Sequence, residues 1–254
     1  SGEALEITHR TTVVVFDKTG TVTEGKPSLT DLVSCGRLSE GELAEILYST
    51  EKLSDHPIAR AIAEWGETRS LKNATAISEI HVLTGLGLSA TAADGRSFLL
   101  GNPKLMENEN IDISELDDKI TSLQSMGKTV ICVAVEGSLA GIAAVADTIK
   151  ESAPRTVARL KEMGVKTVLL TGDNAAAARA IAATAGIDEV ISDVLPTEKA
   201  AVISQLKKEG ETVMMVGDGI NDAPAIKQAD VGISMGITGS EITKEASDII
   251  LLDD

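Results

Sequence analysis

Aromatic side chains are scarce in this sequence: two Phe, one Trp and one Tyr make up 2% of its 254 residues. The hydrophobic core therefore has to be built from Ala, Val, Ile and Leu, which suit buried parallel strands. In other respects the composition is that of a globular protein, 43% hydrophobic and 24% charged, and the length suffices for one large domain or two smaller ones.

Positive charge is also in short supply, because the formal net charge is −16 at pH 7. The summed field of such a chain repels nucleic acids and anionic membrane surfaces, so we expect no nucleic-acid partner. An acidic chain that handles phosphate must instead concentrate cations or backbone N–H groups at one place.

Cysteines and long apolar runs are few. Cys35 and Cys132 form no C-x-x-C pair, and the sequence shows no targeting segment, so we interpret both as reduced core residues of a cytosolic protein rather than metal ligands. No apolar run approaches the roughly 20 residues that span a bilayer. The longest, at residues 139–146, is explained by a buried strand.

From residue 165 onward, short apolar runs alternate with helical patterns, which predicts a doubly wound parallel sheet with helices on both faces. The expected strands are residues 165–170, 188–191, 212–216, 231–235 and 248–252, and the expected helices are 174–185, 197–210 and 222–228. The apolar run at residues 11–16 is assigned to the same sheet.

The middle of the chain has a different pattern. Ser39 with Glu42 forms a capping box, Pro57 suits the first turn of a second helix, and a third helix is expected at residues 114–126. Strands are expected at 76–83, 88–92, 97–101, 129–135 and 139–145, with an Asp94–Gly95 hairpin turn. Hairpins with helices on one side predict an antiparallel α+β domain at residues 28–144, inserted into a parallel domain formed by residues 1–27 and 145–254.

Four aspartates lie at or just beyond the ends of expected strands: Asp17, Asp173, Asp218 and Asp222. Singly, each is better explained as a strand cap or turn residue. Together, at the edge where the carboxyl ends of parallel strands meet, they would repel one another unless a cation neutralised them. Such hard oxygen ligands suit Mg²⁺, and Lys199 is the natural organic counter-charge.

These residues stand in three motifs, DKTGT from Asp17, TGDN from Thr171 and GDGINDAPA from Gly217, which resemble the phosphorylation domain of P-type ATPases. That domain has the haloacid dehalogenase fold. The resemblance implies that Asp17 accepts the γ-phosphoryl group of ATP as an aspartyl-phosphate. It also implies a Mg²⁺ ion held by Asp17, the Thr19 carbonyl and Asp218. The implied catalytic set is Asp17, Lys18, Thr19, Thr171, Gly172, Asp173, Lys199, Asn221 and Asp222, with Thr171 and Lys199 on the phosphoryl oxygens and Asp222 positioning Lys199 or the water shell of the metal.

Thr19 separates a pump from a phosphatase. Hydrolases of this superfamily typically carry an acid two residues after the nucleophile, and threonine cannot do general acid–base chemistry at neutral pH. Loss of such a group typically costs about 10²–10⁴-fold in rate. A phosphoenzyme at Asp17 would therefore persist, as a transporter requires.

A second set of motifs lies in the expected inserted domain: EKLSDHPIARAI from Glu51, GLGLSA from Gly85, and Gly101–Asn102. They resemble the nucleotide-binding domain of heavy-metal-transporting P-type ATPases. The resemblance implies that Glu51 and His56 contact adenine and that Leu88 packs on the base. It also implies that Gly85, Gly87, Gly101 and Asn102 let the nucleotide approach closely. By itself, His56 would more often be a structural residue at a helix start.

Two further motifs match known nucleotide-binding patterns only in part, and one residue, Asp147, has two interpretations. Residues 20–26 approach the Walker A spacing, but Pro27 replaces the Ser/Thr, and Gly85–Leu86–Gly87 is only half of a dinucleotide-binding fingerprint. Asp147 resembles the hinge by which the chain returns from the inserted domain. It could equally be a helix N-cap or loop residue, with Lys150 exposed.

The leading interpretation is the cytoplasmic ATP-binding part of a membrane-bound, metal-exporting P-type ATPase. The segments GNPKLM and VADTIK look most like copper(I) pumps, with zinc, cadmium and silver as alternatives. Its partners would be ATP, with Mg²⁺, and the transmembrane and actuator domains of the same transporter, where the transported metal is bound. The competing hypotheses are a free-standing Mg²⁺-dependent phosphatase and a non-catalytic nucleotide-sensing module.

Overall fold

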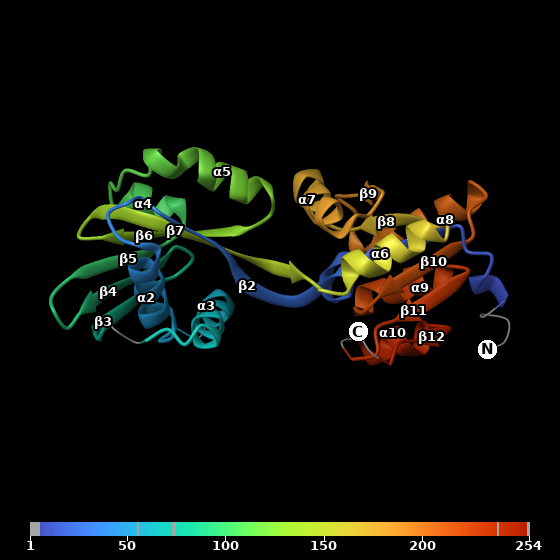
Figure 1. The fold of residues 1–254 in the computed structure, drawn as a ribbon, viewed down its shortest axis with the longest axis horizontal. Helices are drawn as coiled ribbons and strands as arrows, with labels where there is room; N and C mark the ends of the chain where they lie inside the picture. Colours follow the sequence, from blue (N-terminus) through green and yellow to red (C-terminus); the bar gives the residue numbers. More distant parts are fainter. Residues whose placement is uncertain (1–5, 55, 73–74, 238, 253–254) are drawn as a thin grey trace. The chain divides into compact units, whose positions relative to one another are not determined.

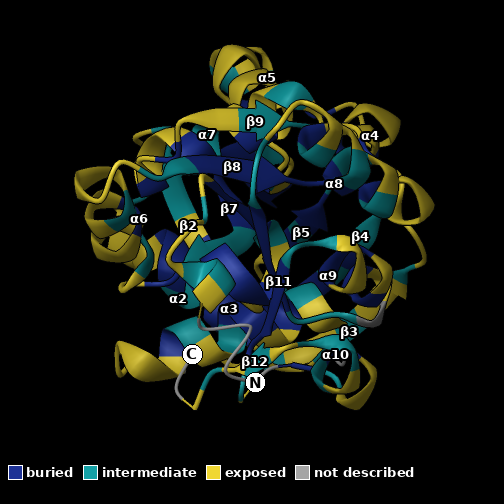
Figure 2. Cartoon of the chain, turned by 90° about the vertical axis from the view of Figure 1, so that its right-hand side faces the viewer, coloured by how far each residue is buried: buried dark blue, intermediate teal, exposed yellow. Residues whose placement is uncertain are grey.

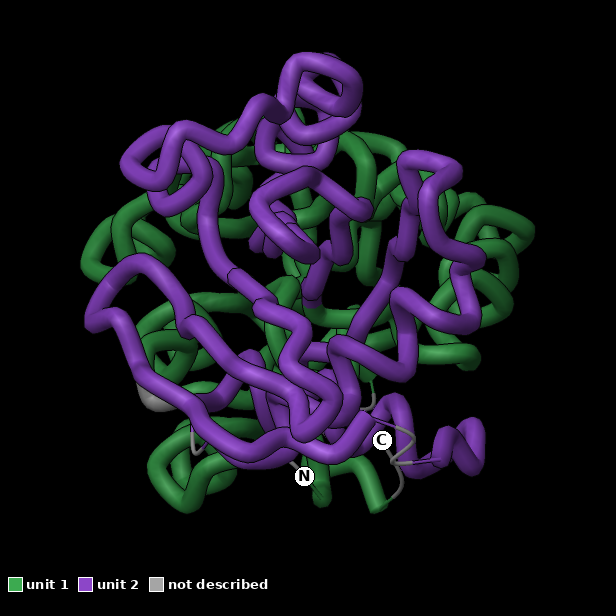
Figure 3. The backbone as a smooth tube through the Cα atoms, turned by 90° about the vertical axis from the view of Figure 1, so that its left-hand side faces the viewer, with its two compact units in different colours: residues 1–25, 147–254 green, residues 26–146 purple. Residues whose placement is uncertain are grey.

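The computed structural model describes residues 6–54, 56–72, 75–237 and 239–252. The chain forms two compact units, unit 1 (Ser1–Gly25 and Asp147–Asp254) and unit 2 (Lys26–Ala146), shown in Figure 3. The first segment of unit 1 ends at residue 25, where the sequence analysis placed the boundary at 27, and the second segment begins at residue 147, where the expected boundary was 145. The chain leaves unit 1 within β2 (Thr23–Ser34) and returns within β7 (Ser138–Ile149) (Figure 1). Among the described helices, none has the length and hydropathy needed to span a bilayer.

Unit 1 is built on a six-stranded parallel sheet in the order β12-β11-β10-β1-β8-β9. Its strands are β1 (Val13–Asp17), β8 (Lys166–Leu170), β9 (Glu189–Ile191), β10 (Val213–Gly217), β11 (Val231–Ser234) and β12 (Ile249–Ile250). The last residue of β1, Asp17, pairs with Leu170, the last of β8. The carboxyl ends of the central strands therefore lie level with one another.

Helices cover both faces of this sheet: α6 (Ala153–Glu162), α7 (Ala175–Ala185), α8 (Lys199–Lys208), α9 (Ala223–Gln228) and α10 (Glu241–Ala246). Successive residues of β1 face opposite sides, so Val14 and Phe16 pack in the core that includes α6 and α7, whereas Val13 and Val15 pack in the core of α8 and α9. Every residue of β1 is buried, while the helices keep exposed outer faces (Figure 2). The doubly wound α/β architecture predicted from the sequence is confirmed.

Unit 2 contains a second six-stranded sheet in the order β2-β7-β6-β5-β4-β3, with antiparallel pairing from β3 to β7. Its other elements are β3 (Ile77–Leu83), β4 (Gly87–Ala92), β5 (Ser97–Gly101), β6 (Thr129–Val135), α2 (Glu40–Glu51), α3 (Pro57–Thr68), α4 (Pro103–Asn108) and α5 (Asp117–Ser125). The helix expected at residues 114–126 opens as a 3₁₀ turn, Ser114–Leu116, before α5 begins.

The expectation that helices cover only one side of this sheet is wrong. Helices α2 and α3 pack in one core with Ile131 and Val133 of β6, and α4 and α5 pack in another with Val130 and Cys132 of the same strand (Figure 1). The signal was present in the sequence, because β6 is apolar at nearly every position instead of alternating, which is typical of a strand buried on both faces. Both cysteines are free thiols, but only Cys132 is fully buried, since Cys35 is half-exposed.

The reading of Asp147 as a helix N-cap or loop residue is also wrong, because it lies inside β7. Lys150, which that alternative required to be exposed, is 5% exposed. The two weak motifs lead into strands, as no helix follows Lys26 or Gly87. The hinge reading of Asp147 stays a prediction; the residue lies in β7 where the chain returns to unit 1.

Candidate functional site

Asp17 closes β1 at the carboxyl edge of the parallel sheet and is only 6% exposed. Lys199, the first residue of α8, places its Nζ 2.5 Å from Asp17 Oδ1 and 2.7 Å from Asp222 Oδ1. Burial works to lower the pKa of Lys199, but the adjacent Asp17 and Asp222 carboxylates outweigh it and raise that pKa. The lysine is therefore held as an ammonium ion between two acids.

Three carboxylates converge at this edge: Asp17, Asp218 and Asp222 each offer an oxygen, and these oxygens all lie within 4.8 Å of one another. Burial, and then the charge of Asp222, raises the pKa of Asp17 to about 6, against the lowering effect of Lys199. A carboxylate that is this costly to ionise is one that a further cation would stabilise.

The segment after Asp17 is a π-type turn, Lys18–Val22, in which Thr19 and Gly20 leave helical backbone angles. Lys18 Nζ lies 2.8 Å from Asp173 Oδ2, so the turn is tied to the segment after β8. Thr171, buried in that segment, accepts a hydrogen bond from the Asp173 amide through Oγ1. Gly172 is exposed beside it, Thr19 is exposed on the turn, and Asn221 is exposed on the 3₁₀ turn Ile220–Asp222.

Two glycines that the sequence analysis did not select shape this edge. A Cβ on Gly20 would lie 1.7 Å from Asp218 Oδ2, and a Cβ on Gly217 would lie 2.8 Å from that of Asp222. Gly20 also has φ of +72°. Both glycines were visible in the motifs, but their steric role depends on contacts between segments distant in sequence.

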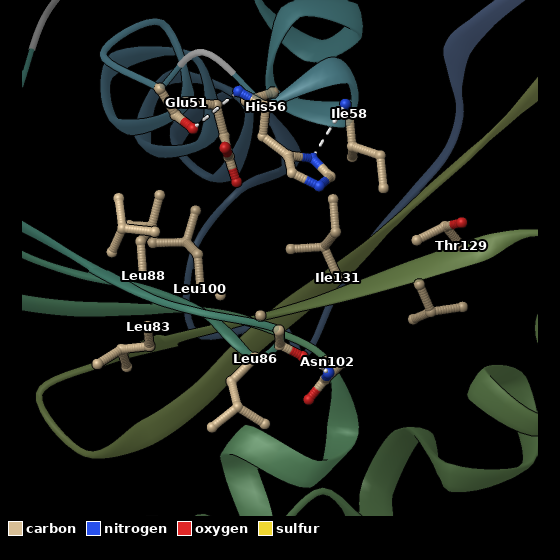
Figure 4. A pocket seen from close by; sticks show the side chains of 17 residues that line it. Glu51, His56, Ile58, Leu83, Leu86, Leu88, Leu100, Asn102, Thr129 and Ile131 are labelled. Carbon is tan, nitrogen blue, oxygen red and sulfur yellow. Dashed lines mark hydrogen bonds between the residues drawn. The ribbon is translucent and has the colours of Figure 1, made fainter.

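Unit 2 contains a cavity of about 240 Å³ between α2, α3 and the sheet (Figure 4). The seven residues predicted to bind nucleotide all line it: Glu51, His56, Gly85, Gly87, Leu88, Gly101 and Asn102. Sequence reasoning missed the apolar floor that Leu100 and Ile131 add. The cavity wall is largely aliphatic, and the His56 imidazole is the one ring among the described residues that line it.

Two polar side chains point into this cavity from the helices (Figure 4). Glu51 is 8% exposed, and burial raises the pKa of its carboxyl to about 7. His56 is the N-cap of α3, and its Nδ1 accepts a hydrogen bond from the Ile58 amide at 3.3 Å. An accepting Nδ1 carries no proton in the neutral ring, so the proton is on Nε2, which remains as a donor. The structural and the binding readings of His56 are thus compatible.

For two of the three glycines that line the cavity, strand packing alone explains why no side chain is present. A Cβ on Gly87 would lie 2.0 Å from the Leu100 carbonyl oxygen, and one on Gly101 would lie 2.2 Å from that of Leu86. Close packing of neighbouring strands therefore already excludes side chains there. Asn102 is likewise engaged, since its Nδ2 donates to the Gly85 carbonyl and its Oδ1 caps α4 at Leu105.

Comparison with known proteins shows which family the chain belongs to and which proteins it is similar to. The haloacid dehalogenase-like hydrolase family matches residues 11–230. A copper-exporting P-type ATPase of Bacillus subtilis (strain 168) is 45% identical over 251 residues, which are 99% of this chain and 31% of that protein. One from Staphylococcus aureus (strain N315) is 43% identical over 252 residues, 99% of this chain and 30% of that protein. The chain thus spans about a third of these relatives.

Solved structures of P-type ATPases have the same fold as this chain. A zinc-transporting PIB-type ATPase in its E2.Pi state superposes with a TM-score of 0.88 at 36% identity, covering 99% of this chain and 40% of that one. The catalytic domain of the CPx-ATPase CopB-B superposes with a TM-score of 0.64 at 27% identity, covering 99% of this chain and 88% of that one. The resemblance and the fold class inferred from the sequence are confirmed.

Proposed function

Because this chain belongs to the haloacid dehalogenase-like hydrolase family and is similar to metal-transporting P-type ATPases along nearly its whole length, we propose that it is the ATP-binding and phosphorylation part of such a pump. Unit 1 is the phosphorylation domain and unit 2 the nucleotide-binding domain. Copper(I) is the favoured cargo, since copper export is what the names of the similar transporters state. The transmembrane and actuator domains belong to the remainder of the transporter.

The observation that carries this proposal is the buried Asp17 at the strand edge, held by Lys199 within a cluster of carboxylates. An oxygen of Asp17 attacks the γ-phosphorus of ATP, a carboxyl O–P bond forms, and the bond to the bridging oxygen breaks as ADP leaves with the electron pair. By the resemblance of their motifs, Lys199 and Thr171 hold the phosphoryl oxygens. Lys199 contacts Asp17 directly, and Thr171 follows Leu170, the residue of β8 that pairs with Asp17. This is positioning and charge neutralisation, which is most of what phosphoryl transfer needs.

The donor set fits Mg²⁺, because it consists of hard oxygen ligands with few protein groups. Asp17, Asp218 and the Thr19 carbonyl would hold the ion, which would supply charge neutralisation to the transferred phosphoryl group. Asp222 serves differently, since Oδ1 accepts from Lys199 and Oδ2 accepts from the Gly219 amide at 3.0 Å. With both oxygens engaged, Asp222 is better suited to position Lys199 than to bind metal.

Thr19 supports a pump over a phosphatase. It stands where a general acid would be needed to hasten hydrolysis, and its hydroxyl cannot serve as one near neutral pH. In unit 2, a neutral Glu51 carboxyl both donates and accepts, and the Nε2–H of His56 donates. These groups match the mixed donor and acceptor edge of adenine, so we assign the base to this cavity.

The test uses beryllofluoride, which adds to a carboxylate as a mimic of an acyl-phosphate. We expect Mg²⁺-dependent, saturable binding to this chain by ¹⁹F NMR, together with transfer of label from γ-³²P-ATP into a hydroxylamine-sensitive bond. Rapid turnover of small phosphate esters without retained label would instead favour the free-standing phosphatase. Nucleotide binding with neither signal would favour the sensing module.

His56→Asn separates capping from base recognition. Asn can still accept from the Ile58 amide, so the helix cap is kept, but the Nε2 donor is lost. We expect ATP affinity, measured by calorimetry, to fall about tenfold, as loss of one hydrogen bond implies, with the melting temperature nearly unchanged. His81→Asn is the matched control, because that histidine is exposed on β3 and contacts Glu79. Unchanged affinity in His56→Asn would contradict the assignment.

Glu51→Gln is expected to stabilise the chain at alkaline pH. The folded-state pKa of Glu51 is about 7 against an ordinary value of 4.5, so the folded state loses stability as pH rises through that window. The variant avoids burying a charge, and we expect urea unfolding at pH 8.5 to show a gain of about 3 kcal/mol that disappears towards pH 4.5. Glu67→Gln, exposed on α3, controls for the change of net charge. A gain that is independent of pH would refute the burial argument.

A further inference from the structure

Thr23, the first residue of β2, connects the turn after Asp17 with the strand that returns from unit 2. Its side chain is fully buried, and its hydroxyl lies 2.5 Å from Asp147 Oδ2, 3.1 Å from the Lys18 carbonyl oxygen and 3.3 Å from the Gly20 amide nitrogen. A hydroxyl has one proton to donate and two lone pairs that accept. The short bond to a carboxylate is the stronger, so the proton goes to Asp147 and the oxygen accepts from Gly20.

The hydrogen bond from the Gly20 amide to Thr23 Oγ1 also orients the carbonyl group of the preceding residue, Thr19. The Gly20 N–H and the Thr19 C=O belong to one peptide group, which is planar and trans, so they point in opposite directions. Anchoring the N–H on Thr23 therefore fixes the direction of the Thr19 carbonyl. In the function proposed above, that carbonyl is a Mg²⁺ ligand.

Asp147 strengthens this arrangement and ties it to the connection between the units. A carboxylate that accepts from the Thr23 hydroxyl polarises it and makes its oxygen a better acceptor for the Gly20 amide. Nearby, the amide of Lys150, the residue after β7, donates to the Val22 carbonyl and holds the turn at a second point. The backbone N–H of Thr23 itself closes the turn on the Lys18 carbonyl.

We propose that Thr23, polarised by Asp147, is a positioning residue that aims the Thr19 carbonyl at the Mg²⁺ site and thereby sets the metal affinity of the phosphorylation site. The inference rests on the proposed function, because it assigns that carbonyl to the metal. It also gives Asp147 a defined task where the chain returns from unit 2: its carboxylate accepts from the Thr23 hydroxyl that orients the metal ligand.

The test is Thr23→Val, which keeps the shape of the side chain and removes the hydroxyl. We expect the Mg²⁺ concentration for half-maximal beryllofluoride binding to rise about tenfold, as the loss of one ligand's orientation implies. In the metal-free chain, the Gly20 amide should exchange faster with solvent and its ¹⁵N resonance should move. Thr23→Ser, which restores the hydroxyl, is expected to return both readouts to wild-type values, and ATP binding to unit 2 should not change.

Thr167→Val is the matched control. Thr167 is also fully buried in unit 1, and its hydroxyl bonds the Asp188 carboxylate at 3.0 Å. Thr167 pairs with Val14, which stands three residues before Asp17 in β1. Three residues of a strand span about 10 Å, so Thr167 is well separated from the site. A general loss of packing or hydrogen bonding would affect both valine variants alike, so a Mg²⁺ shift confined to Thr23→Val supports positioning.

Asp147→Ala gives a second route, in case the valine variant does not fold, and is expected to weaken Mg²⁺ binding in the same direction but less. Wild-type Mg²⁺ half-saturation in both Thr23→Val and Asp147→Ala, or equal shifts in Thr167→Val, overturns the proposal. The proposed function fails separately: it is overturned if the wild-type chain does not bind beryllofluoride, or if Asp17→Asn binds it equally well.

Discussion

Asp17→Asn is expected to abolish phosphoryl transfer to this chain while leaving nucleotide binding intact. The amide is a poor nucleophile and cannot form an acyl-phosphate by the same route. Label from γ-³²P-ATP and beryllofluoride binding should both fall to background. ATP affinity should remain that of the wild type, because the residues proposed to bind the base belong to unit 2, whereas Asp17 belongs to unit 1.

The stability of this variant supplies an independent check. The pKa of Asp17 is raised to about 6 from an ordinary value near 3.8, so ionised Asp17 costs stability above pH 6 in the metal-free chain. Asp17→Asn should therefore melt no lower than the wild type at pH 8 without Mg²⁺, although it loses a bond from Lys199. An inactive variant that melted much lower would be explained by unfolding.

Asp230→Asn is the matched control for this experiment. Asp230 also accepts from a lysine, Lys207, at 3.1 Å, and caps the start of β10 through the Val213 amide. It lies at the amino end of that strand, away from the site. Full labelling in Asp230→Asn and none in Asp17→Asn would assign the phosphoryl group to Asp17, whereas labelling in both would remove Asp17 as the nucleophile.

Much of this molecule could be predicted from its sequence because the signals are local. Fully apolar runs alternating with helical patterns indicate a parallel sheet buried on both faces. Three of the four aspartates at strand ends, Asp17, Asp218 and Asp222, converge as expected, whereas Asp173 contacts Lys18 instead. The Ser39–Glu42 capping box formed at the start of α2 as expected. The residues predicted to bind nucleotide were chosen through family motifs, and the structure gathers them around one cavity, while their role stays a prediction.

The features that could not be predicted are those formed by contacts between segments far apart in the sequence. The reason that Gly87 and Gly101 lack side chains is the approach of neighbouring strands, which no local pattern encodes. The second helical layer of unit 2 was missed because hairpins suggested a one-sided sheet, although the unbroken apolar run of β6 indicated burial on both faces. The link from Thr23 to Asp147 joins residues that are 124 positions apart.

Gly20→Ala is the substitution expected to weaken the proposed metal site most without replacing any of its ligands. The new Cβ would lie 1.7 Å from Asp218 Oδ2, so either the carboxylate or the turn that carries Thr19 must move. Displacement of a catalytic group by about 1 Å can cost about 10²-fold, and we expect Mg²⁺-dependent beryllofluoride affinity to fall by about that factor. The fold should persist, because the clash is confined to the rim of the sheet.

Gly164→Ala is the control that separates backbone strain from the contact with Asp218. Gly164 has φ of +76°, close to the +72° of Gly20, but a Cβ there would meet nothing within 4 Å. Both variants force alanine into the left-handed region and should lose similar stability for that reason. If Gly164→Ala keeps wild-type affinity and Gly20→Ala loses it, contact with Asp218 is responsible. Equal affinities in the two variants would mean that Asp218 is displaced at no cost and is therefore not a metal ligand.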